Sequence, residues 1–136
     1  MRSLPPESNC RRLLVVDDEP SIRATLKDTL EMQGFQITEA GSAREAMRAL
    51  GQHDIDLLLT DIHMPEITGI ELAEAARAKD AALPILLMSG SEPDQTASDC
   101  GCAFLRKPFS FRELAAKVRE LLPIERRTAA AQAEGL

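Results

Sequence analysis

The chain has 136 residues, of which 44% are hydrophobic and 28% are charged, and this length fits a single domain with one core. It contains no run of about 18 apolar residues and no apolar secretory signal near its start, so we expect no membrane span and a cytoplasmic location. The formal net charge is −6, and residues 13–122 hold 11 basic and 19 acidic side chains, a surface that would repel a phosphate backbone and argues against direct binding to nucleic acid.

The first part of the chain predicts two strands and the helix between them. Residues 13–16 are a continuous aliphatic run, which indicates a buried strand. Residues 20–33 follow with apolar side chains at steps of four, the spacing of one helix face, and Gly34 is the kind of residue that commonly ends a helix. Residues 35–40 then predict the second strand.

Two capping boxes predict the next two helices. Ser42 is followed three residues later by Glu45, and Thr68 by Glu71, a pattern in which the two side chains satisfy free backbone N–H groups at a helix start. Apolar side chains follow each box at helical spacing. Between the two helices, residues 55–60 form an apolar run that predicts the third strand.

The last part of the chain repeats this alternation. Residues 83–88 and 103–106 predict the fourth and fifth strands, and Pro84 separates the fourth strand from the helix before it. Ser110 and Glu113 form a third capping box, which predicts a final helix with a continuous apolar stripe.

Strand and helix thus alternate in the order expected of an α/β fold. Strands that are apolar throughout, instead of alternating, are buried on both faces, which implies a parallel sheet covered by helices on both sides. Right-handed crossovers then make the sheet doubly wound. We expect one domain over residues 12–122 between two tails, residues 1–11 and 123–136, and no output domain in the second tail.

Charged and polar side chains follow the predicted strands at the edge where open parallel sheets bind ligands, outside the carboxyl ends of the strands. Asp17 and Asp18 come after the first strand, and Asp61 after the third. Ser89 comes after the fourth strand and Lys107 after the fifth. We therefore expect three carboxylates, a hydroxyl and an ammonium group to lie together at one edge.

Three carboxylates at one edge repel one another unless a cation lies between them. Oxygen ligands alone favour a hard ion, and a small, incomplete set of carboxylates fits Mg²⁺ that keeps several waters. A metal ion and a lysine beside one carboxylate also form a phosphoryl-transfer site. In such a site the carboxylate attacks phosphorus, and the cations neutralise charge on the phosphoryl oxygens.

Four short motifs lie at the ends of the predicted strands: VVDDEP at 15–20, LLTDIHMPEITG at 58–69, MSG at 88–90 and KPF at 107–109. In this order they resemble the receiver domain of two-component response regulators, and the resemblance runs over nearly the whole chain. It implies a flavodoxin-like fold, a (βα)5 doubly wound parallel sheet with strand order 2-1-3-4-5.

The resemblance also implies the chemistry of the acidic residues. Asp61 would accept a phosphoryl group from a histidine kinase or a histidine phosphotransfer protein. Mg²⁺ would be the cofactor, bound directly by Asp18, Asp61 and the backbone carbonyl of His63, with Asp17 acting through water.

Four further residues would take part in the switch that the family uses. Ser89 and Lys107 would each bind a phosphoryl oxygen, and the Lys107–Pro108 peptide bond would be cis. Phe104 matches the aromatic residue that turns inward on activation, into space that Ser89 vacates. The result would be a changed protein-interaction surface, read by a downstream protein or by an output domain missing from this chain.

The chain departs from the family pattern before the fifth strand. Only 18 positions separate Ser89 from Lys107, a few fewer than receivers usually have, and residues 92–100 are polar. We expect the fourth helix to be shortened or irregular. The family commonly dimerises or signals through this helix, so the usual dimer is in doubt here.

The three cysteines, Cys10, Cys100 and Cys102, form no C-x-x-C pair. An odd number argues against a disulfide framework, and two neighbouring sulfurs without further ligands would leave zinc half-coordinated. We therefore expect reduced thiols.

Other functions were weighed against the receiver. A magnesium-dependent phosphohydrolase with an aspartate nucleophile would need a second Asp where this chain has His63. P-loop NTPases and Rossmann dehydrogenases are excluded because their glycine-rich motifs are absent. A pseudo-receiver that binds partners without phosphorylation would lack an acidic residue, the acceptor or the lysine, and all are present.

The side chain of His63 is either an exposed loop residue without a role or one that controls how water reaches the phosphoryl group.

Overall fold

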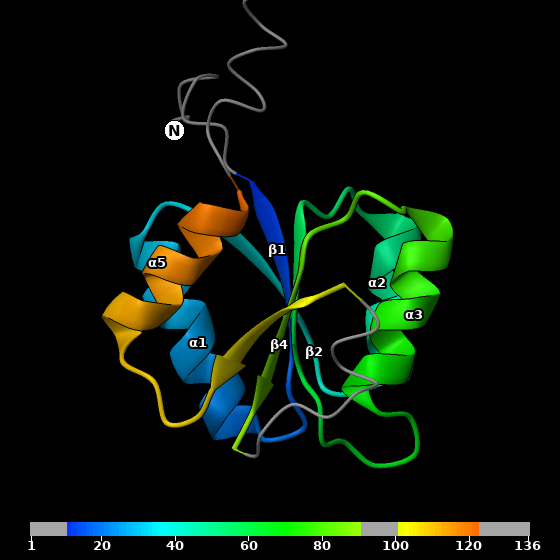
Figure 1. Cartoon of the computed structure of the whole chain (residues 1–136), viewed down its shortest axis with the longest axis horizontal. Coiled ribbons are helices and arrows are strands. Elements are labelled where there is room, and N and C mark those ends of the chain that lie inside the picture. Colours follow the sequence, from blue (N-terminus) through cyan, green and yellow to red (C-terminus); the bar gives the residue numbers. More distant parts are fainter. Residues whose placement is uncertain (1–10, 91–100, 123–136) are drawn as a thin grey trace, which may run out of the picture.

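The computed structural model describes residues 11–90 and 101–122, in which strands and helices alternate along the chain (Figure 1). The strands are β1 Arg12–Val16, β2 Gln36–Ala40, β3 Leu57–Asp61, β4 Ile85–Ser89 and β5 Ala103–Arg106, and the helices are α1 Pro20–Met32, α2 Ala43–Gln52, α3 Gly69–Lys79 and α5 Phe111–Leu121.

The strands form one parallel sheet in the order β2-β1-β3-β4-β5. Helices α1 and α5 cover one face of the sheet, and α2 and α3 cover the other (Figure 1). The predicted doubly wound, flavodoxin-like fold is therefore confirmed. The carboxyl ends of the strands, where the site residues were expected, lie toward the bottom of Figure 1.

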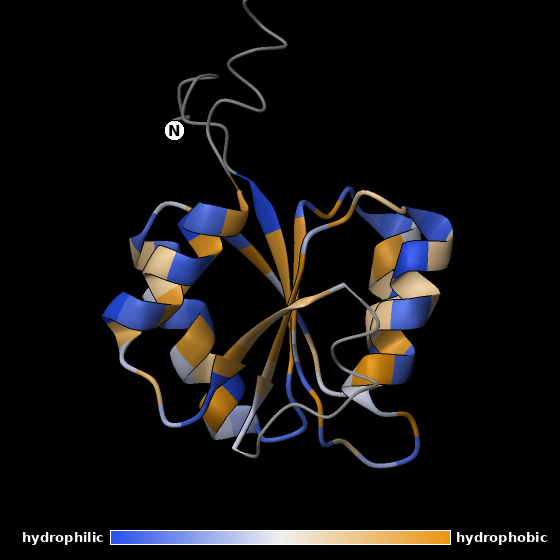
Figure 2. Cartoon of the chain, in the orientation of Figure 1, coloured by the Kyte–Doolittle hydropathy of each residue, from blue (hydrophilic) through white to orange (hydrophobic). Residues whose placement is uncertain are grey.

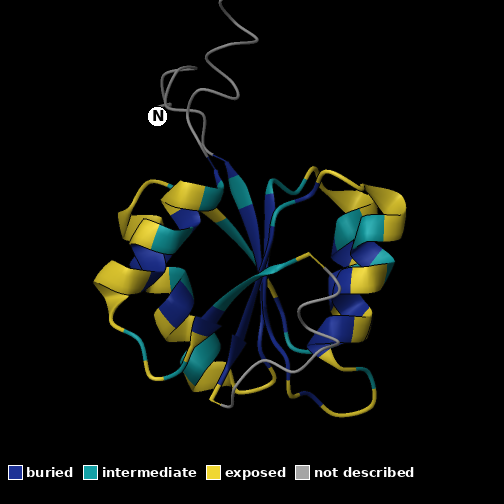
Figure 3. Cartoon of the chain, in the orientation of Figure 1, coloured by how far each residue is buried: buried dark blue, intermediate teal, exposed yellow. Residues whose placement is uncertain are grey.

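The three central strands, β1, β3 and β4, are buried on both faces because their side chains alternate between two apolar clusters. In β1, Leu14 and Val16 pack in the cluster that includes α2 and α3, whereas Leu13 and Val15 pack in the cluster that includes α1 and α5. Figures 2 and 3 show apolar, buried central strands between helices whose outer faces are hydrophilic and exposed. Continuous apolar runs in the sequence correspond to this two-sided burial.

Two strands are shifted toward the carboxyl edge relative to the prediction. Strands β3 and β4 each begin two residues later and end one residue later than the apolar runs indicated. Their parallel pairing with neighbouring strands continues to their last residues, Asp61 and Ser89. Both residues therefore belong to the sheet, and the backbone that carries them is fixed by the pairing.

The helix starts confirm two of the three predicted capping boxes. Thr68 and Ser110 each accept a hydrogen bond from a backbone N–H three residues on, and the reciprocal bond from the glutamate is also made. At α2, the Ser42 hydroxyl accepts from Glu45 N, but the Glu45 carboxylate accepts from Gly41 N at 2.7 Å instead of from Ser42 N. This box is only half formed because the N–H of Gly41, just past the end of β2, donates to the Glu45 carboxylate.

Some predictions concern residues outside the described ranges. The short or irregular fourth helix over 92–100 lies there, as do residues 1–10 and 123–136 of the predicted tails. The expectation of reduced thiols is wrong for Cys102, which is disulfide-bonded. An odd number of cysteines excludes only a fully paired set, and one pair with one cysteine left over remains compatible with it.

Candidate functional site

The predicted site residues come together at the carboxyl edge of the sheet. Asp17 directly follows β1, and Asp61 and Ser89 are the last residues of β3 and β4. Lys107 directly follows β5. Four strands that are neighbours in the sheet, in the order β1-β3-β4-β5, therefore each bring one polar side chain to this edge.

Three carboxylates form a tight cluster here. Asp17, Asp18 and Asp61 each offer one oxygen, and these oxygens all lie within 4.8 Å of one another. Asp17 and Asp61 are buried, with exposed fractions of 0% and 8%, whereas Asp18 is exposed. Negative charges this close destabilise one another unless a cation shares the site.

Lys107 brings a positive charge to the cluster. Its Nζ lies 3.3 Å from Asp61 Oδ2 and 3.8 Å from Asp17 Oδ2. One ammonium group facing three carboxylates leaves the cluster negative. The site can therefore attract a further cation.

The pKa of the buried Asp17 carboxyl group is raised. Its Oδ1 accepts a hydrogen bond from Glu19 N at 2.9 Å, but its Oδ2 is buried without a hydrogen-bond partner among the described residues. Burial raises the pKa of the Asp17 carboxyl, and the charges of Asp61 and Asp18 raise it further. The bond from Glu19 and the nearby Lys107 ammonium each lower the pKa by more than either of those charges raises it, but burial has the largest effect and the pKa stays raised.

The cluster fits a hard divalent cation. All three ligand groups are carboxylates, which Mg²⁺ prefers, and three of them are few enough to leave room for the waters that Mg²⁺ keeps. The buried Oδ2 of Asp17 has no donor in the part of the chain that the structure describes, and a bound cation or its water would supply the missing partner. Asp17, Asp18 and Asp61 are therefore the residues that could hold the ion.

A close backbone contact positions the loop after Asp61. Gly69 N donates to the carbonyl oxygen of Ile62 at 2.8 Å, and a Cβ at position 69 would lie 2.2 Å from the Asp61 carbonyl oxygen. Any side chain there would force the backbone apart. This contact explains the glycine that ends the LLTDIHMPEITG motif, because it lets the start of α3 pack against the end of β3.

His63 contacts both Asp61 and Ser89. Its backbone N donates to Asp61 Oδ1 at 3.1 Å, and its imidazole Nε2 lies 3.1 Å from Ser89 Oγ. Ser89 is buried, and its carbonyl oxygen accepts from Lys107 N at 2.8 Å. The resemblance implied a role for the backbone carbonyl of His63, and its side chain was left between no role and control of water. The contact with Ser89 was not predicted, since a side-chain contact over 26 positions depends on how β3 and β4 pair.

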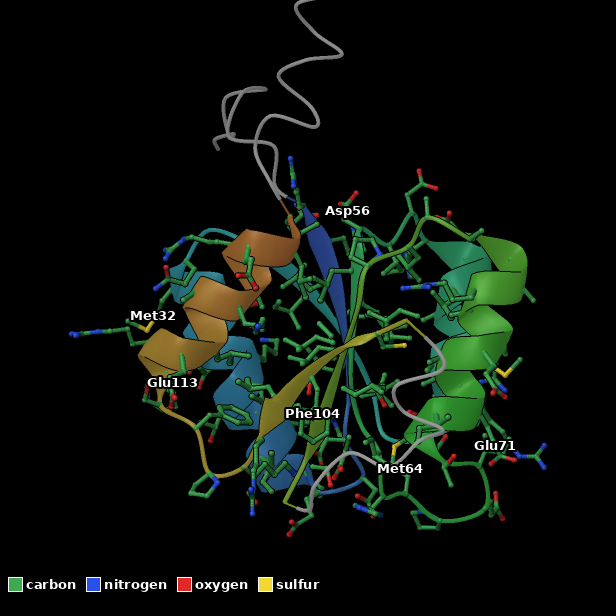
Figure 4. All side chains as sticks on the ribbon, in the orientation of Figure 1. Met32, Asp56, Met64, Glu71, Phe104 and Glu113 are labelled. Atoms are coloured by element: carbon green, nitrogen blue, oxygen red, sulfur yellow. The ribbon has the colours of Figure 1, made fainter. Side chains whose placement is uncertain are left out.

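The two remaining predicted residues lie on or beside β5. Phe104 is half-buried and packs against the cluster that includes α2 and α3 (Figure 4). The Lys107–Pro108 peptide bond is cis, as the resemblance implied.

Sequence reasoning missed Arg23. Its Nη1 donates to the carbonyl oxygen of Asp17 at 2.7 Å, and its Nε lies 3.2 Å from Glu39 Oε1. Arg23 thus ties α1 to the ends of β1 and β2 and supports the backbone of the acidic pair. An arginine on a predicted helix surface carries no local sign of such a role.

Comparison with known proteins identifies the family. A family model described as the response regulator receiver domain matches residues 13–119. The chain belongs to this family. It is a receiver domain of two-component signalling, which confirms the predicted function class.

Two curated relatives show how much of a full-length protein this receiver represents. It is 37% identical over 115 residues to the transcriptional activator protein PfeR of Pseudomonas aeruginosa, covering 82% of this chain and 37% of PfeR. It is 35% identical over 127 residues to the transcriptional regulatory protein PrrA of Mycobacterium tuberculosis, covering 90% of this chain and 54% of PrrA. The receiver therefore spans about half the length of these relatives, or less.

Solved structures show the same fold. The response regulator protein TrrA from Thermotoga maritima, in complex with Mg(2+)-BeF, is 36% identical with a TM-score of 0.77, covering 82% of this chain and 98% of TrrA. The chemotaxis response regulator CheY4 of Vibrio cholerae is 28% identical with a TM-score of 0.78, covering 83% of this chain and 99% of CheY4. Within residues 11–90 and 101–122 of this receiver, no helix combines the length and the apolar content needed to cross a bilayer.

Proposed function

We propose that Asp61 of this receiver accepts a phosphoryl group from the phosphohistidine of a histidine kinase or a histidine phosphotransfer protein. The observation that supports this most is the position of its carboxylate, 3.3 Å from the Lys107 ammonium and within the acidic cluster. One carboxylate oxygen attacks phosphorus, the bond from phosphorus to the imidazole nitrogen breaks, and the electron pair leaves with the imidazole. The product is an acyl phosphate on Asp61.

The acidic cluster supports Mg²⁺ as the cofactor of this transfer. Asp18, Asp61 and the backbone carbonyl of His63 would bind the ion directly, and Asp17 would bind it through water. When bound, Mg²⁺ neutralises negative charge on the phosphoryl oxygens. The buried Oδ2 of Asp17, which has no hydrogen-bond partner among the residues described, supports this assignment.

Ser89 and Lys107 are the donors proposed for the phosphoryl oxygens. They lie on neighbouring strands, and the Lys107 ammonium already faces Asp61. In the proposed switch, Ser89 moves toward the phosphoryl group and Phe104 turns into the space it leaves. The pairing of β4 with β5, which places Phe104 opposite Leu87, supports a coupled movement of these two strands.

The output of the switch would be a protein contact. We expect the changed surface to bind a downstream protein or an output domain outside this chain, and not nucleic acid directly, because residues 13–122 carry a net charge of −8. The site would also assist its own phosphorylation and slow dephosphorylation, since the same residues surround the acyl phosphate. The cytoplasmic location and the domain limits at 12 and 122 remain predictions from the sequence.

Incubation with a small acyl phosphate and Mg²⁺, followed by intact-mass spectrometry, tests the proposal. We expect the wild-type chain to gain one phosphoryl group only when Mg²⁺ is present, and Asp61→Asn to gain none. Asp56→Asn is the matched control, because Asp56 lies at the opposite edge of the sheet (Figure 4) and should leave the adduct unchanged. An adduct that persists in Asp61→Asn, or steady turnover without any adduct, would contradict the proposal, and turnover would favour a phosphohydrolase.

A further inference from the structure

One imidazole links the proposed phosphoacceptor to the proposed phosphoryl donor before any phosphoryl group arrives. His63 is exposed, yet its Nε2 lies 3.1 Å from the Oγ of buried Ser89, and its backbone N donates to Asp61 Oδ1 at the same distance. The strand pairing holds Ser89 and Asp61 in place. The contact is therefore made by a loop side chain that reaches over the carboxyl end of the sheet.

The chemistry of the two groups decides which one donates. A serine hydroxyl has one proton to donate, and a neutral imidazole has one nitrogen that accepts. That nitrogen is more basic than a hydroxyl oxygen, so the favoured bond runs from Ser89 Oγ–H to His63 Nε2, as it does in serine–histidine pairs of hydrolases. In this arrangement the single proton of the Ser89 hydroxyl is already used.

A phosphoryl group on Asp61 would need that same proton, because its oxygens accept hydrogen bonds and donate none. Resting on the proposed function, we propose that His63 is a positioning residue that competes with the phosphoryl group for the Ser89 hydroxyl. His63 thereby stabilises the resting arrangement. Activation exchanges the bond from Ser89 to His63 for a bond from Ser89 to a phosphoryl oxygen, and the difference between the two sets how readily the receiver switches.

Binding of Mg²⁺ and beryllofluoride, a phosphoryl mimic, measures this competition without transfer chemistry. Because a hydrogen bond contributes modestly to a binding equilibrium, we expect His63→Ala to bind beryllofluoride about 3- to 10-fold more tightly than wild type, by calorimetry at a pH where imidazole is neutral. His53→Ala is the matched control. It removes the only other histidine, which is exposed in the loop between α2 and β3, and should leave the affinity unchanged.

A double-mutant cycle separates competition for Ser89 from a general effect of the loop. In a Ser89→Ala background, we expect His63→Ala to change beryllofluoride affinity by less than about 1.5-fold, because no hydroxyl remains to compete for. The ¹⁵N resonance of His63 Nε2 gives an independent signal. It should shift when Mg²⁺ and beryllofluoride are added to wild type, and should already have the shifted value in Ser89→Ala.

Weaker or unchanged binding by His63→Ala, or the same gain in affinity with and without Ser89, would overturn the inference while leaving Asp61 as the proposed acceptor. Failure of the wild-type chain to bind beryllofluoride with Mg²⁺ at all would instead overturn the proposed function, and the competition with it.

Discussion

The two edges of the sheet use acidic side chains in opposite ways. At the amino edge, Asp56 (Figure 4) accepts through Oδ2 from Arg12 N at 2.8 Å, where β1 begins. Asp80 Oδ1 accepts from Ala82 N at 3.0 Å. At the carboxyl edge, three carboxylates crowd together, and one buried oxygen of Asp17 has no hydrogen-bond donor within residues 11–90 and 101–122. Acids at the first edge hold the backbone, whereas acids at the second repel one another and depend on cations.

A cavity in the structure lies away from the acidic cluster. A cavity of about 340 Å³ lies at the amino edge between α2 and α3, where its lining includes Leu50, Ile55 and Leu83. None of the clustered carboxylates lines it. In this receiver, clustered and buried charges therefore indicate the candidate site, and the position of the cavity does not.

Removing Lys107 should produce the largest loss at the carboxyl edge. Lys107→Ala takes away the ammonium group 3.3 Å from Asp61, where negative charge develops during transfer. We expect the rate of phosphorylation by a small acyl phosphate to fall about 100- to 1,000-fold, measured by timed intact-mass spectra. Lys117→Ala, which removes a surface pair with Glu120 on α5, is the control with an unchanged rate. Equal rates in both variants would show that the Lys107 charge plays no part.

A methyl group tests how differently the two edges tolerate change. Gly69→Ala should destabilise the domain by about 2–3 kcal/mol, because the new Cβ would lie 2.2 Å from the Asp61 carbonyl oxygen. Gly51→Ala, inside α2 near the amino edge, should stabilise it by about 0.5 kcal/mol, since alanine favours helix and its Cβ meets only the Lys79 side chain at 3.7 Å. Urea unfolding measures the change in the free energy of unfolding for both variants. A stability loss of the same size at the two glycines would contradict the predicted difference between the two edges.

Asp17→Asn should stabilise the domain when Mg²⁺ is absent. The substitution removes one of three crowded charges, and we expect the free energy of unfolding to rise by about 1–2 kcal/mol. Because the pKa of the Asp17 carboxyl is raised on folding, the folded state binds its proton more tightly than the unfolded state does. Wild type therefore loses stability as the pH rises from about 4 through this raised pKa.

The stability difference between Asp17→Asn and wild type should widen over that pH range and then stay constant. Thermal unfolding over a pH series measures it, and a second series with Mg²⁺ should narrow the difference by stabilising wild type more. A difference that is constant from acid to neutral pH would mean that Asp17 carries no cost in the folded state.

The smallest effect is expected at the amino edge. Asp56→Ala removes the acceptor for Arg12 N, and we expect a loss of about 1 kcal/mol in the free energy of unfolding. Binding of Mg²⁺ should not change, because the acidic cluster lies at the other edge. Weaker Mg²⁺ binding in this variant would show that the two edges are coupled through the sheet.

Local pattern was sufficient for most of the fold. The aliphatic run of β1 and the boxes at Thr68 and Ser110 are read from neighbouring residues, and the structure confirms each of them. The half-formed box at Ser42 was not predicted. The Glu45 carboxylate accepts from the N–H of Gly41 and not from that of the adjacent Ser42, and the sequence pattern does not distinguish these two donors. The shift of β3 was also missed, because pairing with β4 sets where that strand ends.

The site divides in the same way. Strands and helices alternate, and an acidic, hydroxyl or lysine residue follows four of the predicted strands. This pattern was enough to predict which residues lie together, because parallel strands end at one edge. The support from Arg23 to the backbone of Asp17, and the contact of His63 with Ser89, could not be predicted. Each depends on the direction of a long or exposed side chain relative to another strand.

The amino-acid sequence by itself determined most of the elements, the parallel sheet and the charges at the carboxyl edge, since these follow from spacing along the chain. Only the tertiary structure decided which carboxylate oxygen has no donor among the described residues, where only a glycine fits against the backbone, and which imidazole reaches the serine. Each depends on distances of a few ångströms between groups on different strands, helices and loops, and packing of the whole sheet sets these distances.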